Sequence, residues 1–90
     1  MNNKIALESL VMDLKRVALG YQRGSFKMAR RFYQEALARK EEIDPLTLRP
    51  YARNLLDKIM TLQNNKDDIL AEDALMLSTL LENYIRTYPL

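Results

Sequence analysis

The chain of 90 residues contains no cysteine and no histidine. Without cysteine, neither a disulfide framework nor a thiolate site can form. Without histidine, the chain lacks the commonest general base and metal ligand near neutral pH. Zinc and iron–sulfur sites have no ligand set when both residue types are missing. These absences argue against catalysis.

Glycine is also scarce. The two glycines, Gly20 and Gly24, lie four residues apart with no following Lys-Ser or Lys-Thr, so no phosphate-binding loop is present. Carboxylates could still hold Mg²⁺, but such sites usually take ligands from facing helices, and helix capping and solvation account for both acidic clusters. We therefore expect no enzyme activity, no cofactor and no metal site, with a carboxylate-based enzyme as the third-ranked alternative. The clusters are Glu41, Glu42 and Asp44, and Asp67, Asp68, Glu72 and Asp73.

The chain lacks a long uncharged hydrophobic run as well. Its N-terminal segment is interrupted by Glu8, Asp13, Lys15 and Arg16, which is the pattern of neither a signal peptide nor a membrane span. We expect a cytoplasmic protein that does not contact membranes.

Hydrophobic residues make up 48% of the chain and charged residues 29%, a balance typical of a globular protein. The hydrophobic period is helical throughout, and no stretch alternates like a strand. Short connections favour antiparallel neighbours. The sequence therefore predicts an all-α, four-helix bundle-like single domain over residues 1–90, built from two helical hairpins. The expected helices span about residues 3–20, 25–43, 48–63 and 66–88.

Local signals mark the helix ends. Gly20 and Gly24 indicate the end of the first helix, and Ser25 is a candidate N-cap for the second. Thr47 as N-cap would place Pro50 in the first turn of the third helix, where its missing N–H is harmless. For the fourth helix, the candidate caps are Asn65 and Asp67.

Helical spacing also predicts which side chains face the core. Ala29 and Ala36 should let the first helix pack closely against the second, whereas Ala38 falls on the outer face. The expected core residues, helix by helix, are Leu7, Leu10, Val11, Leu14, Val17, Ala18 and Tyr21; Phe26, Ala29, Phe32, Tyr33, Ala36, Leu37 and Ile43; Tyr51, Ala52, Leu55, Leu56, Ile59 and Leu62; and Leu70, Ala74, Leu77, Leu81, Tyr84, Ile85 and Tyr88.

The segment of residues 24–37 carries glycine, alanine and aromatic residues at a characteristic spacing: Gly24, Phe26, Ala29, Tyr33, Ala36 and Leu37. It resembles the second half of a tetratricopeptide repeat and is similar to the hairpin of the small helical domains called MIT. Both families bind partner peptides or helices, so the resemblance implies that role here.

Charge is unevenly distributed. Residues 1–40 have a balance of +6 and residues 41–90 a balance of −4. Arg23, Lys27, Arg30 and Arg31 form a candidate basic face that could neutralise phosphates, with the aromatic residues expected on the core side, away from the arginines. A solvated helix face is the interpretation we favour, so nucleic-acid binding is the second-ranked function.

The most informative pattern is apolar residues outside the expected core. Ile5, Met12 and Leu19 recur every seven residues opposite the core side of the first helix. Leu75 and Met76 lie outside the core side of the fourth helix, on opposite flanks. One alternative is that some of these residues belong to the core, since a helix that touches two neighbours uses a broad apolar face. We favour an interface, because apolar residues at heptad spacing bury against another helix. We therefore expect a non-catalytic protein–protein interaction or self-association domain, whose partner is a second copy in a homo-oligomer or another protein.

Overall fold

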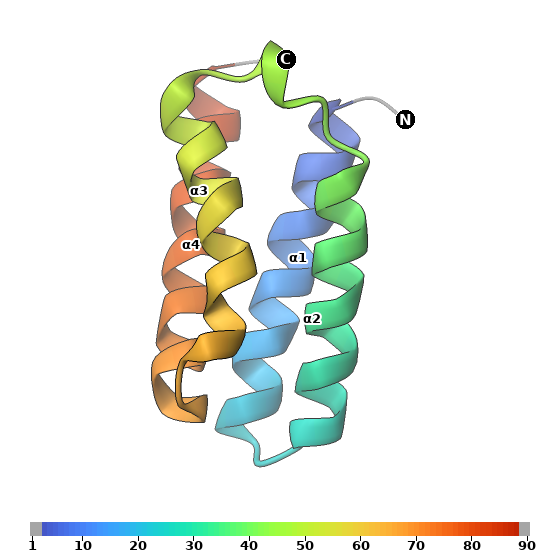
Figure 1. The fold of residues 1–90 in the computed structure, drawn as a ribbon, viewed down its shortest axis with the longest axis vertical. Coiled ribbons are helices and arrows are strands. Elements are labelled where there is room, and N and C mark those ends of the chain that lie inside the picture. Colours follow the sequence, from blue (N-terminus) through green and yellow to red (C-terminus); the bar gives the residue numbers. More distant parts are fainter. Residues whose placement is uncertain (1–2, 89–90) are drawn as a thin grey trace.

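The computed structural model describes residues 3–88, and these form an all-α bundle without strands. The elements are α1 (Asn3–Gln22), α2 (Phe26–Glu41), the 3₁₀ helix η1 (Pro45–Thr47), α3 (Pro50–Thr61), the 3₁₀ helix η2 (Leu62–Asn64) and α4 (Asp67–Thr87). Figure 1 shows two antiparallel hairpins, α1–α2 and α3–α4, side by side in an elongated molecule. The predicted fold class is confirmed.

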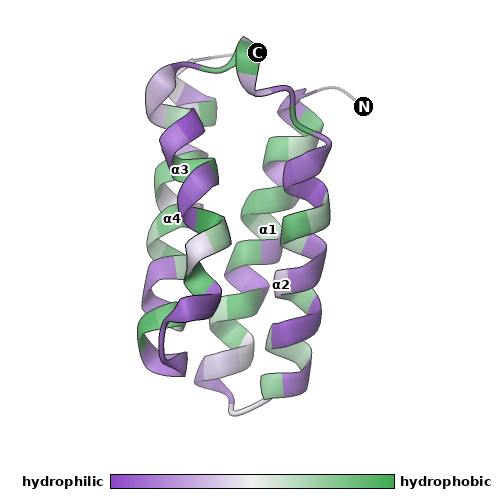
Figure 2. Cartoon of the chain, in the orientation of Figure 1, coloured by the Kyte–Doolittle hydropathy of each residue, from purple (hydrophilic) through white to green (hydrophobic). Residues whose placement is uncertain are grey.

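Helix α1 is central to the packing. It contacts both α2 and α4 along its length, whereas α3 packs mainly against α4. The core is apolar, and hydrophilic residues cover the outward sides of α2 and α3 (Figure 2). Tyr33 extends into the core from α2, and its hydroxyl donates a hydrogen bond of 2.7 Å to the backbone oxygen of Ile59 in α3. This bond ties the two hairpins together.

Helices α1 and α2 approach each other closely at Gly20 and Ala29. A Cβ atom at Gly20 would lie 2.9 Å from both the Cβ and the backbone nitrogen of Ala29. No larger residue fits at Gly20 unless the two helices separate, because the obstacle includes backbone. Gly20 lies inside α1, and Gly24, with φ of 74°, forms the turn after it.

Several predicted helix ends were wrong by a few residues. Helix α1 continues two residues beyond Gly20, and Ser25 precedes α2 without a capping bond from its hydroxyl. Thr47 belongs to η1, so Arg49 takes the N-cap position of α3 and Pro50 becomes its first residue. Lys66, rather than Asn65 or Asp67, takes that position in α4. Arg49 and Lys66 have extended backbones, which start a helix without a side-chain cap.

Three aromatic residues assigned to the core are exposed. Phe26 is 43% exposed, Tyr51 52% and Tyr88 38%. Each lies in the first turn of a helix or just past its last residue, where fewer neighbouring helices are available to cover it. Phe26 packs instead on Tyr21, with ring centroids 5.7 Å apart.

The close contact of α1 and α2 gives a stability test. Ala29 is fully buried and Ala38 is exposed. Ala29→Leu should lower the free energy of unfolding by about 1–3 kcal/mol, because overpacking forces the helices apart. Ala38→Leu should change it by less than about 0.5 kcal/mol, as expected for surface substitutions. Urea unfolding followed by circular dichroism measures both, and a larger loss for Ala38→Leu would show that the assigned helix face is wrong.

Candidate interaction surfaces

The outer side of α1 carries the heptad stripe, which we define as Ile5, Met12 and Leu19. Their side chains are 54%, 45% and 37% exposed. All three lie on the side of α1 opposite to its buried residues, which face α2 and α4. The helical spacing thus placed these residues correctly outside the core, and the structure leaves all three partly exposed.

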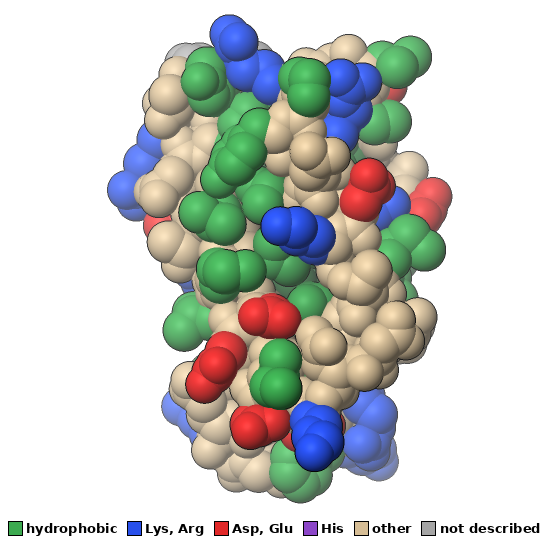
Figure 3. Space-filling view, turned by 60° about the vertical axis from the view of Figure 1, so that its left-hand side comes forward, with side chains coloured by type: hydrophobic (Ala, Val, Ile, Leu, Met, Phe, Trp, Pro, Cys, Tyr) green, Lys and Arg blue, Asp and Glu red, His purple; other side chains and the backbone are tan. Residues whose placement is uncertain are grey.

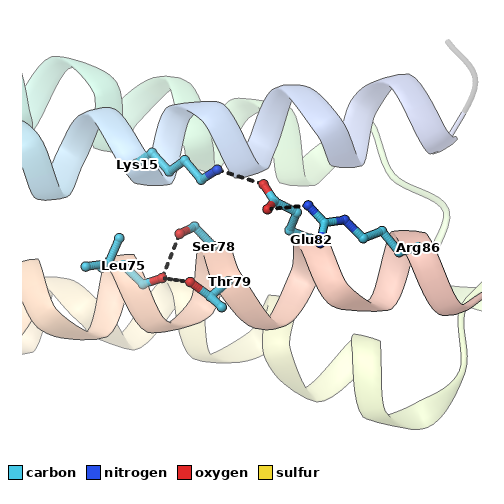
Figure 4. Close-up of polar contacts among 6 residues, drawn as sticks. All are labelled: Lys15, Leu75, Ser78, Thr79, Glu82 and Arg86. Carbon is cyan, nitrogen blue, oxygen red and sulfur yellow. Dashed lines mark hydrogen bonds and ion pairs between the residues drawn. The ribbon is translucent and has the colours of Figure 1, made fainter.

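Charged residues flank the heptad stripe on both sides. On the α4 side, the Lys15 ammonium lies 2.7 Å from Oε2 of Glu82 (Figure 4). Arg86 contacts the other oxygen of the same carboxylate at 3.2 Å. Hydrogen bonding and charge attraction from Lys15 lower the pKa of Glu82. The stripe is therefore bordered on this side by a cluster of paired charges.

Beside this cluster, an open groove of about 390 Å³ follows the junction of α1 and α4. Its lining combines Val11, Met12 and Ile85 with charged side chains at its edges. Met12 thus belongs both to the heptad stripe and to the groove. The apolar surface of α1 extends toward α4.

Leu75 and Met76 are exposed by 44% and 47% but lie on different sides of α4. Leu75 lines a groove with Tyr21 and Gln22 of α1, so it extends the apolar surface near the end of that helix. Met76 lies four residues before Leu80, which lines a groove with Tyr51 of α3. The five candidate interface residues therefore do not form one surface.

The side of α4 that carries Met76 has its own apolar residues. Ile69, seven residues before Met76, is 45% exposed, and Leu80 is partly buried. Figure 3 shows hydrophobic side chains gathered along this side of the molecule. Ile69 was not predicted as an interface residue, although Ile69 and Met76 have the same heptad spacing as the residues of the stripe on α1.

The groove that contains Leu75 has a volume of about 420 Å³ and an acidic edge. Tyr21 and Phe26 lie at one side, and Asp67, Asp68 and Glu72 of α4 lie at the other. Burial, together with the negative charge of Asp67, raises the pKa of Tyr21. Asp67 and Asp68 are in the first turn of α4, where they stabilise the positive end of the helix dipole.

All four residues of the predicted basic face, Arg23, Lys27, Arg30 and Arg31, are exposed. Its charge is reduced locally, since Arg31 lies 3.6 Å from Glu35. The expectation that no aromatic residue accompanies the arginines was wrong. Phe32 is only partly buried, and the guanidinium groups of Arg16 and Arg31 lie 5.4 and 5.9 Å from its ring centroid.

Between α1 and α2 lies a buried carboxyl group. Asp13 is 4% exposed, and its Oδ2 atom has no hydrogen-bond partner among residues 3–88. Its Oδ1 atom lies 3.6 Å from Arg16. Burial, and then the nearby Glu35, raise the pKa of Asp13, whereas Arg39 and Arg16 act in the opposite direction. The ionised form of Asp13 therefore opposes folding.

Comparisons with protein families, curated proteins and solved structures found no match to this chain. Within residues 3–88, no helix is both long and apolar enough to cross a membrane, and no group of acidic residues is arranged to hold a metal ion. The resemblance to tetratricopeptide and MIT hairpins, the lack of catalytic activity and the cytoplasmic location stay predictions.

Nucleic-acid binding by the basic face can be tested directly. We expect little binding to DNA or RNA at physiological salt, because the local positive charge is partly neutralised and the net charge is only +2. Fluorescence anisotropy with labelled oligonucleotides measures it. Submicromolar affinity that weakens steeply with salt, and that the double variant Arg30→Glu/Arg31→Glu abolishes, would overturn this expectation.

Asp13 makes the stability of the fold depend on pH. A carboxyl group whose pKa is higher in the folded state stabilises the fold below its unfolded pKa of about 3.9 and ceases to do so as pH rises through the folded value. Asp13→Asn should therefore be more stable than the native chain at pH 7, by about 1 kcal/mol, because the neutral amide avoids the cost of burying a charge. This advantage should vanish at pH 3.

Urea unfolding at the two pH values measures the difference. Asp57→Asn, at an exposed position on α3, is the matched control and should change little at either pH. Greater stability of the native chain than of Asp13→Asn at pH 7 would contradict the assigned cost of this buried charge.

Proposed function

We propose that the chain is a non-catalytic helical interaction domain that contacts its partner through the heptad stripe on α1. The observation that carries this proposal is the exposure of Ile5, Met12 and Leu19 in register on one side of a helix whose other sides are packed. Burial of such a stripe against another helix removes apolar surface from water, which is the main favourable term in protein association.

The surroundings of the stripe support a protein partner. The groove of Val11, Met12 and Ile85 offers depressions beside the exposed side chains, and Leu75 adds an apolar contact at the end of α1. The Lys15–Glu82–Arg86 cluster gives the polar border typical of protein interfaces. An amphipathic helix laid along α1 would contact all these features.

Binding of nucleic acid at the basic face is the second candidate function. The specific observation that favours it is Phe32, whose ring centroid lies 5.4 and 5.9 Å from the guanidinium groups of Arg16 and Arg31. Single-stranded nucleic acids stack on aromatic rings in positively charged grooves. The stripe ranks higher because its three apolar side chains are exposed in register along one helix.

The proposal predicts which methionine matters for binding. Met12 and Met76 are 45% and 47% exposed on different helices and so form a matched pair. The immobilised chain should retain a protein from an extract of its source cell, or a labelled copy of itself. Met12→Glu should weaken retention about tenfold or more, because a charge would have to be buried without a partner. Met76→Glu should retain the same protein.

Circular dichroism should show equal helicity for the native chain and both variants, which separates lost binding from lost folding. Retention abolished by Met76→Glu and unaffected by Met12→Glu would place the interface on the other side of α4 and overturn the proposal. Retention of no protein by the native chain would overturn it as well.

A further inference from the structure

The spacing of the heptad stripe is symmetric about Met12. Ile5 precedes Met12 by seven residues and Leu19 follows it by seven. Two copies of α1 can therefore pack stripe against stripe in either of two orientations. An antiparallel pair places Ile5 of each copy on Leu19 of the other, and a parallel pair places each residue on its own equivalent. Met12 meets Met12 in both.

The charges that flank the stripe distinguish the two orientations. At 100° per residue, Glu8 and Lys15 lie on one flank of the stripe, and Ser9 and Arg16 on the other. The structure identifies both flanks. Lys15 bonds to Glu82 of α4, and Glu8 lines the groove between α1 and α4. Arg16 lies over Phe32 of α2.

In an antiparallel pair, the two-fold axis is perpendicular to the helix axes. Each flank therefore faces the same flank of the second copy, with the order of its residues reversed. Glu8 then lies opposite Lys15 of the second copy, and the symmetry creates this attractive pair twice. In a parallel pair, the flank beside α4 meets the flank beside α2. Lys15 would then lie opposite Arg16, a repulsion that also occurs twice.

We propose that the partner of the heptad stripe is a second copy of this chain, packed antiparallel with the two-fold axis at Met12. This inference rests on the proposed function, since it names the occupant of the same surface. Three features support it. Apolar residues pair along the whole stripe, opposite charges face each other beside it, and the same helix supplies both sides of the contact. Flanking charges of this kind set partner choice and orientation in paired helices.

The absence of cysteine from the chain makes the orientation measurable, because each introduced thiol is unique. With a short bismaleimide crosslinker, Met12→Cys should form a covalent dimer in high yield. Ile5→Cys and Leu19→Cys should each form little dimer alone, and an equimolar mixture of the two should crosslink. Met76→Cys, of similar exposure, is the matched control and should stay monomeric on a denaturing gel.

Efficient crosslinking of Ile5→Cys or Leu19→Cys alone would show a parallel pair and overturn the inference. Crosslinking of Met76→Cys in preference to Met12→Cys would place the contact between copies on α4 and overturn it too.

The charge pairing has a separate test in the mass of the native chain by light scattering. The native chain should have the mass of two copies at tens of micromolar. The dissociation constant of the Glu8→Lys dimer should be several-fold higher, most clearly at low salt. Asp57→Lys makes the same charge change on α3 and should leave the dimer intact. An unchanged dimer in Glu8→Lys would reject the antiparallel pairing.

A native mass of one copy would overturn the second copy as partner. The proposed function would then stand or fall on whether the stripe retains a different protein, so the two failures are distinguishable.

Discussion

The arrangement of this bundle depends on the close approach of α1 and α2 at Gly20 and Ala29. A Cβ atom at Gly20 would lie 2.9 Å from the backbone of Ala29, so the rotation of α1 about its own axis is fixed at this contact. Once this rotation is fixed, every other residue of α1 has its side assigned. Leu7, Leu14 and Val17 point into the core, and the heptad stripe points away from it.

The central position of α1 explains why its outer side is narrow. Helices α2 and α4 pack on two sides of α1, and Lys15 and Arg16 extend over these neighbours to Glu82 and Phe32. What remains between the two charged flanks is a single line of apolar residues. A narrow apolar line bordered by fixed charges favours a contact along one helix, in a defined direction, over a broad nonspecific one.

The sequence predicted the fold class and most of the core, because buried residues such as Leu10, Ile59 and Leu81 follow the helical period closely. It failed at the helix ends. Phe26 and Tyr51 lie in the first turns of their helices, where the hydrophobic period continues but neighbouring helices no longer cover the side chains. The capping residues were also ambiguous, since Thr47, Asn65 and Asp67 are all good caps in isolation and the backbone began each helix elsewhere.

The candidate surface was only partly predictable. Periodicity identified Ile5, Met12 and Leu19, because one helix suffices to define a side. It placed Leu75 and Met76 on opposite flanks of α4 but could not show which neighbouring helix each flank faces. Nor could it show the contact of Phe32 with Arg16, which comes from a different helix. Contacts between helices distant in sequence decide these points.

The most direct test of the account is the NMR spectrum of the methionine methyl groups on dilution. Met12, Met60 and Met76 are exposed on α1, α3 and α4 and report on three sides of the bundle. If two copies of the chain contact each other through the outer side of α1, the Met12 signal should shift or broaden as the chain is diluted from millimolar to low micromolar concentration, while those of Met60 and Met76 stay constant. A constant Met12 signal alongside a shifting Met76 signal would contradict it.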